Sequence, residues 1–174
     1  MYKKYTYTTK SGTQALKTSL EILKSKKVII PTYTCEDILT AVLSVGCEPI
    51  IVDCNKNLQI DLFSVKNIID SADTIIIPHM FGIQNPVLPF HDKGLNIIED
   101  LSQCHGLPEL GKYADIVVSS TNKSKWLDNG GGGYIFSDQR LNLPKTSFNW
   151  DIQTKYNNRK SKAQELLNAG LNLI

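Results

Sequence analysis

Residues 120–133, "STNKSKWLDNGGGG", combine two lysines with four consecutive glycines, a combination that suits several kinds of chemistry. A lysine becomes a nucleophile when its surroundings favour the neutral amine, and Trp126 or Lys123 could create such surroundings for Lys125. The alternative is a solvated loop lysine. A Walker loop needs G-x-x-x-x-G-K-[ST], and a dinucleotide fingerprint needs glycines that open a helix. No stretch supplies the Walker pattern, and the four glycines lead into "YIFS", which is typical of a strand, so both phosphate loops are excluded. A reactive amine stays as a hypothesis.

A second candidate is the carboxylate in "EDLSQCHG", residues 99–106. This run begins where an apolar stretch ends, so Asp100 stands at the tip of a strand, with Gln103 about one helical turn later. A carboxylate in this position can pair with a cation. The alternative is that Asp100 caps a helix whose first turn contains Ser102 and Gln103, a use that position alone favours.

The third candidate is an anion site at "SGTQAL", residues 11–16. Small hydroxyl residues and a glycine stand there just before an amphipathic helix. Free N–H groups and the positive end of the helix dipole make such a helix start suitable for an anion. Ser120, after the apolar run "ADIVVS", could add a hydroxyl to the same anion. The alternative is an ordinary Ser or Thr cap, which is the commoner use of these residues.

Short β-branched runs alternate with longer stretches of helical apolar spacing, which is typical of an α/β protein. Strands are predicted at 27–30, 49–52, 74–77, 96–98, 115–118 and 134–136, and helices at 13–23, 36–45, 62–69 and 160–168. Runs such as "DTIIIP" lack polar alternation, so we expect an open, mostly parallel sheet covered by helices on both faces. Open α/β sheets bind ligands at the carboxyl ends of their strands. Polar residues collect there at 32–35, 79–82, 99–103 and 119–125.

Length and composition indicate one globular domain. The 174 residues are 41% hydrophobic and 21% charged with a net charge of +2, which selects neither a nucleic-acid partner nor disorder. No apolar run approaches the roughly 20 residues of a membrane span, and "MYKKYTYTTK" has no apolar signal-peptide core, so we expect a cytoplasmic protein without a membrane partner. Four scattered cysteines and three histidines lack metal-ligand spacing, so no metal site is predicted.

The order and spacing of these pieces resemble the DegT/DnrJ group of sugar aminotransferases, within the fold type I pyridoxal-phosphate enzymes. The matching runs are "SGTQAL", "VIIPTYT", "AVLSVGCEPIIVDC", "IIIPHMFG", "IIEDLSQCHG" and "ADIVVSSTNKSKWLDNGGGGYIFS". They cover roughly 10–137 in family order, and "YNNRKSKAQELLNAG" is similar to the family's N-x-R stretch, with Asn157 and Arg159 on its marked positions. The resemblance implies a three-layer αβα large domain with a mostly parallel central sheet.

The resemblance also implies a domain organisation. Residues 1–174 form a single pyridoxal-phosphate-binding large domain, in which 138–174 are a surface excursion and a final helix. The family's small C-terminal domain and part of its N-terminal segment are absent, so we expect a chain truncated at both ends. Family sites are completed across a homodimer by the N-x-R stretch, which adds Asn157 to the cofactor-binding residues, and we expect a homodimer here as well.

The cofactor implied by the resemblance is pyridoxal 5′-phosphate. Lys125 would form the Schiff base with its aldehyde, while Lys123 does not align and becomes a loop residue. Asp100 would pair with the pyridine nitrogen, and Gln103 would lie beside the phenolic oxygen. The residues matched to the 5′-phosphate are Gly12, Thr13, Gln14 and Ser120. Most relatives stack an aromatic ring on the cofactor where this chain has Cys35, so either Tyr33 substitutes or the cofactor is held more loosely.

The reaction implied by the resemblance is transamination from glutamate to a nucleotide-linked keto sugar, with Lys125 moving the proton as a general base. A dehydratase branch of the family has histidine in place of the lysine, and Lys125 argues against that branch. The alternative function is a catalytically inactive remnant that acts as a binding or regulatory module, which the truncation and Cys35 motivate.

Overall fold

The structure is a computed structural model that describes residues 3–107, 109–125, 127–128 and 130–143. Four features predicted from the sequence lie outside the described residues: Trp126, Asn157, Arg159 and the helix at 160–168. In the described part of the chain, no helix has the length and apolar character needed to cross a membrane.

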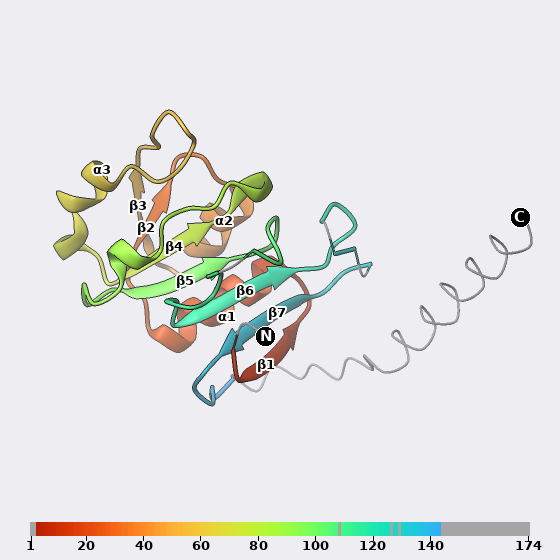
Figure 1. Ribbon diagram of the computed structural model, residues 1–174. Helices are drawn as coiled ribbons and strands as arrows, with labels where there is room; N and C mark the ends of the chain where they lie inside the picture. Colours follow the sequence, from red (N-terminus) through yellow and green to blue (C-terminus); the bar gives the residue numbers. More distant parts are fainter. Residues whose placement is uncertain (1–2, 108, 126, 129, 144–174) are drawn as a thin grey trace, which may run out of the picture. The chain divides into compact units, whose positions relative to one another are not determined.

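Seven strands form one mixed sheet in the order β1-β7-β6-β5-β4-β2-β3 (Figure 1). The strands are β1 (Tyr5–Thr9), β2 (Lys27–Pro31), β3 (Glu48–Val52), β4 (Thr74–Pro78), β5 (Asn96–Asp100), β6 (Ile116–Ser120) and β7 (Gly133–Ser137). Each neighbouring pair from β3 across to β6 is parallel, whereas β7 runs antiparallel to both β6 and β1. The six predicted strands and the mostly parallel sheet are therefore confirmed, with boundaries that differ by one or two residues.

Strand β1 was not predicted from the sequence. Its residues, "YTYTT", alternate between half-buried and exposed, and they carry no apolar run. The strand forms by pairing with β7, in a register that places Tyr5 opposite Ser137. The partner is therefore far away in the sequence, so local pattern contains little of the information that places this edge strand.

Among the described residues, three α-helices pack beside the sheet: α1 (Gly12–Leu23), α2 (Glu36–Ser44) and α3 (Leu62–Lys66). The predictions for α1 and α2 are confirmed to within one residue. The predicted helix at 62–69 is too long, because α3 ends at Lys66 and a separate 3-10 turn, Ile69–Ser71, follows. Ile68 and Ile69 pack against the core from this turn, which meets the apolar pattern without a continued helix.

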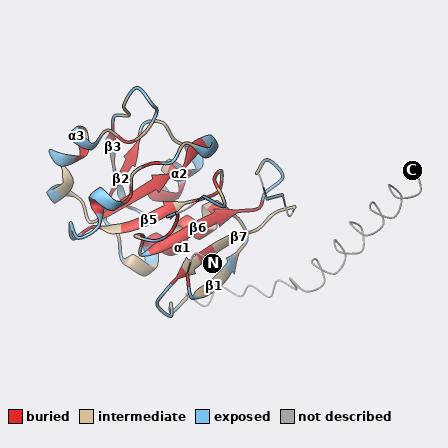
Figure 2. Ribbon diagram, viewed as in Figure 1, coloured by how far each residue is buried: buried red, intermediate tan, exposed pale blue. Residues whose placement is uncertain are grey.

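The core lies on both faces of the sheet, and Figure 2 shows the central strands as deeply buried. Side chains alternate along β4, so Ile75 and Ile77 join one cluster while Ile76 joins the other. The helices α1 and α2 cover the second cluster, and the first is covered by α3 and by short turns and loops. Burial on both faces explains the uniformly apolar strands and confirms the three-layer arrangement.

The glycine run forms the turn that leads into β7. Gly130, Gly131 and Gly132 have φ values of 68°, 127° and 108°, which glycine adopts most easily. A Cβ on Gly133 would collide with the backbone carbonyl of Ser11, which precedes α1. The glycines therefore turn the chain and bring β7 against the start of α1.

Candidate functional site

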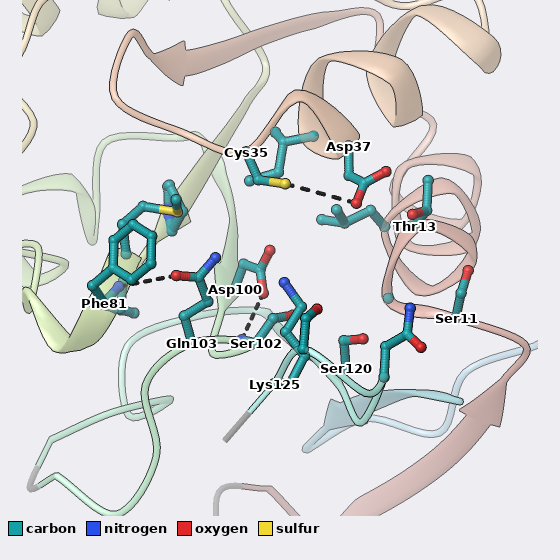
Figure 3. A pocket seen from close by; sticks show the side chains of 18 residues that line it. Ser11, Thr13, Cys35, Asp37, Phe81, Asp100, Ser102, Gln103, Ser120 and Lys125 are labelled. Carbon is teal, nitrogen blue, oxygen red and sulfur yellow. Dashed lines mark hydrogen bonds between the residues drawn. The ribbon is translucent and has the colours of Figure 1, made fainter. Parts of the chain in front are cut away.

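A pocket of about 460 Å³ opens where the ends of β4, β5 and β6 meet the starts of α1 and α2 (Figure 3). Strands β4 to β6 are parallel, so their carboxyl ends share one edge of the sheet, as expected for a ligand site. Seven of the predicted site residues line the pocket: Gly12, Thr13, Cys35, Asp100, Gln103, Ser120 and Lys125. Gln14 and Tyr33 are not among the lining residues, and Asn157 lies outside the described residues.

Asp100 ends β5 with its carboxylate at the pocket. The N–H of Ser102 donates to Asp100 Oδ1 at 2.8 Å, and the residues that follow form a turn, not a helix. The alternative that Asp100 caps a helix is therefore wrong, because the carboxylate holds a local turn instead. Burial raises the pKa of Asp100, while hydrogen bonds from Ser102 and the positive charge of Lys125 lower it to a smaller extent.

Lys125 reaches the pocket from the loop after β6. Figure 3 shows its side chain between Asp100 and Ser120. The N–H of Lys125 donates to the carbonyl of Asn122 at 2.9 Å, which closes a turn at the base of this loop. Lys123 is exposed and does not line the pocket, so of these two lysines only Lys125 does.

The start of α1 forms the opposite wall of the pocket. Ser11 Oγ accepts from the N–H of Gln14 at 3.1 Å and caps the helix, while Gly12 and Thr13 occupy the first turn, where N–H groups have no intrahelical acceptor. A Cβ on Gly12 would lie 2.8 Å from Ser120 Cβ, so glycine allows β6 to end directly beside the helix start. The Gln14 side chain points along the helix and donates to Thr18 Oγ1 at 3.2 Å.

The start of α2 brings Cys35 and Asp37 to the pocket. Cys35 Sγ donates to Asp37 Oδ2 at 3.7 Å, a contact visible at the top of Figure 3. Of the two candidates for contact with the cofactor ring, only Cys35 lines the pocket, whereas Tyr33 is half-buried outside it. The structure also places at the pocket a residue that the sequence did not single out, Phe81, which is 71% exposed.

The model of the DegT/DnrJ/EryC1/StrS aminotransferase family matches residues 1–149. The chain belongs to this family. Among members of the DegT/DnrJ/EryC1/StrS family, 3-oxo-glucose-6-phosphate:glutamate aminotransferase of Bacillus subtilis is 34% identical over 134 residues, which are 72% of this chain and 30% of that protein. GDP-perosamine synthase of Escherichia coli O157:H7 is 28% identical over 149 residues, which are 78% of this chain and 41% of that protein. The chain spans between 28% and 42% of the length of the curated relatives that it matches.

Solved structures of DegT/DnrJ/EryC1/StrS relatives share this architecture. The crystal structure of NtdA from Bacillus subtilis with bound cofactor PMP is 32% identical and has a TM-score of 0.72, covering 80% of this chain and 34% of that chain. The aminotransferase from Psychrobacter cryohalolentis is 25% identical with a TM-score of 0.72, covering 79% and 38%. These matches confirm the predicted large-domain fold of the fold type I pyridoxal-phosphate enzymes.

Proposed function

We propose that this chain is the cofactor-binding large domain of a pyridoxal-phosphate-dependent sugar aminotransferase, with Lys125 as the residue that attaches the cofactor. The observation that supports this most is the meeting of Lys125, Asp100 and the start of α1 at one pocket. These three features come from segments far apart in the sequence, and each matches a different part of the same cofactor.

The pocket fits pyridoxal phosphate by the chemistry of its donors. The first turn of α1 and the Ser120 hydroxyl offer N–H and O–H donors to a phosphate, and the missing Cβ of Gly12 keeps them close together. Asp100 offers a carboxylate to a ring cation, and burial makes that carboxylate costly without a positive partner. Phosphate donors and carboxylate thus stand on two sides of the Lys125 amine.

When bound, pyridoxal phosphate supplies an aldehyde that condenses with amines and a protonated ring that withdraws electrons. The residues of this chain would hold and orient that group. Asp100 would keep the proton on the ring nitrogen, and Lys125, once released from the cofactor, would move the proton at the amine-bearing carbon of the substrate. Ser120, Gly12 and Thr13 would hold the phosphate during both half-reactions.

The substrates that we propose are glutamate as amino donor and a nucleotide-linked keto sugar as acceptor. The relatives support this choice by name: one is a 3-oxo-glucose-6-phosphate:glutamate aminotransferase, and two are GDP-perosamine synthases. The proposal also includes two predictions made from the sequence and its resemblance to the family: the protein forms a homodimer, and it is located in the cytoplasm.

Reduction with borohydride tests the proposal. The chain mixed with pyridoxal phosphate should gain a visible absorbance that borohydride removes, and peptide mass spectrometry should then find the cofactor on Lys125. Lys123→Ala is the matched control and should behave as the wild type, whereas Lys125→Ala should lose covalent attachment. Attachment to Lys123, or retention of the absorbance by Lys125→Ala, would contradict the proposal.

Addition of glutamate then separates an enzyme from an inactive remnant. A chain that carries out the first half-reaction converts its bound cofactor to the aminated form and releases one 2-oxoglutarate for each cofactor. A chain that attaches the cofactor yet releases no 2-oxoglutarate would support the binding or regulatory alternative.

A further inference from the structure

A buried hydrogen-bonded pair of side chains, His79 and Glu99, lies at the inner side of the pocket, which His79 helps to line. His79 Nε2 is 2.9 Å from Glu99 Oε1, and both side chains have no exposed surface. The N–H of Asn85 donates to His79 Nδ1 at 3.0 Å, so Nδ1 is an acceptor and the Nε2–H donates to Glu99. The other carboxylate oxygen of Glu99 accepts from the N–H of Gly111 at 2.9 Å.

Asn85 makes two further hydrogen bonds through its side chain. Its side-chain amide donates to the carbonyl of Pro78 at 2.5 Å and accepts from the N–H of Ile60 at 2.6 Å. We call His79, Glu99 and Asn85 the anchor network. Its bonds hold both ends of the segment 78–85, which connects the end of β4 to the rim of the pocket.

The segment held by the anchor network contains a strained residue. Phe81 has a φ of 51° and a ψ of 32°, in the left-handed region that a bulky residue rarely adopts. Such a conformation persists only where surrounding contacts hold it in place. In this conformation the N–H of Phe81 donates to Gln103 Oε1 at 3.2 Å (Figure 3).

The bond from Phe81 decides which way the Gln103 amide faces. Because Oε1 accepts from Phe81, the amide nitrogen lies on the other side of the group, and Figure 3 shows it turned away from Phe81. Gln103 thus presents a donor beside Asp100, which is the part of the pocket where the resemblance places the cofactor's phenolic oxygen.

We propose that the anchor network is a positioning device, which holds Phe81 in its left-handed conformation so that the Gln103 amide donates to the phenolic oxygen of the cofactor. This role rests on the proposed function, because the oxygen belongs to pyridoxal phosphate. In this role His79 and Glu99 act through Phe81 and Gln103, which makes them positioning residues.

Glu99→Gln tests the role with little change in shape. A Gln side chain has one oxygen and one NH₂ group, so either the His79 Nε2–H or the N–H of Gly111 then faces that NH₂ group, which is also a donor. His79 cannot change tautomer to relieve this clash, because its Nδ1 already accepts from Asn85. The segment must shift. We expect loss of hydrogen-exchange protection at the Phe81 amide. We also expect the pH at which the bound cofactor changes absorbance to rise by about half to one unit, the size of one lost hydrogen bond.

Two further variants show that the effect passes through Gln103. Gln103→Leu should give a similar rise in that pH, and adding Glu99→Gln to Gln103→Leu should cause no further rise. Glu21→Gln, on the exposed side of α1, is the charge-matched control and should match the wild type. Where Glu99→Gln does not fold, Asn85→Ala replaces it with the same expected results, because it removes two anchoring bonds and leaves the hydrogen bond between His79 and Glu99 intact.

Unchanged exchange at Phe81 and an unchanged absorbance pH in a destabilised Glu99→Gln would overturn the proposal, since the network would then be structural only. A rise that persists in the Gln103→Leu background would also overturn it. A wild-type chain that takes up no cofactor contradicts the proposed function instead. In that case, exchange at the Phe81 amide and the Gln103 side-chain amide decides whether the network orients Gln103.

Discussion

The surroundings of Asp100 in the pocket change the pKa of its carboxyl group. Burial raises its pKa above the usual value near 4, so Asp100 releases its proton at a higher pH in the folded protein than in the unfolded chain. An acid of this kind supports folding fully below its ordinary pKa. That support is lost as the pH rises through the raised folded-state pKa, because the carboxylate is then buried without a full partner.

We therefore predict that Asp100→Asn stabilises the cofactor-free protein at neutral pH. Asn keeps an oxygen that accepts from the Ser102 amide but carries no charge to bury. The gain in the free energy of unfolding should shrink as the pH falls toward about 4, where the wild-type Asp100 side chain becomes uncharged, as Asn is at every pH. Urea unfolding across this pH range measures the difference.

The control for this prediction is Asp70→Asn, an exposed aspartate outside the pocket, which should show no such trend. A gain from Asp100→Asn that stays constant between about pH 8 and about pH 4 would mean that burial of charge is not the cause.

Helix α1 has a capped N-terminus that is also part of the pocket wall, and Ser11 contributes to both. Ser11 caps the helix through the Gln14 amide, and the same first turn forms a wall of the pocket. Asp61 caps α3 in the same manner through the Phe63 amide, but α3 contributes no lining residue. The two caps form a natural comparison between helix stability and ligand binding.

We predict that Ser11→Ala and Asp61→Ala each lower the free energy of unfolding by about 1 kcal/mol, the usual cost of a lost cap. Only Ser11→Ala should weaken the binding of pyridoxal phosphate, because of these two helices only α1 begins at the pocket. Urea unfolding and cofactor titration measure the two effects. Equal affinity in both variants would show that the start of α1 does not hold the phosphate.

At the scale of the whole molecule, the cofactor should act as a stabilising ligand. Residues at the ends of β4, β5 and β6 and at the starts of α1 and α2 line the pocket, so a group that binds there contacts three strands and two helices at once. A ligand that binds only the folded state adds about 2.7 kcal/mol at a hundredfold excess over its Kd.

We predict that pyridoxal phosphate at this excess raises the Tm of the chain by about 5–10 °C, the shift expected for that free energy in a domain of this size. Pyridoxal without the phosphate, at the same concentration, should raise the Tm less, because it cannot use the donors at α1 and Ser120. Differential scanning calorimetry measures both shifts. Equal shifts with the two compounds would argue against a phosphate site there.

The sequence alone determined the features that depend on neighbouring residues. Apolar runs and helical spacing located six strands and the helices α1 and α2, since burial on one or two faces leaves a local pattern. Motif order also singled out Lys125, Asp100 and the start of α1, which the structure brings to one pocket.

Only the tertiary structure decided the features that depend on distant partners. Strand β1 exists because β7 pairs with it, and the left-handed Phe81 is held by His79, Glu99 and Asn85. The Gln14 side chain donates to Thr18 within its own helix, a contact that its type and position alone do not specify. Hydrogen-bond partners depend on strand register and loop conformation, which long-range packing sets, and no short run of residues contains that information.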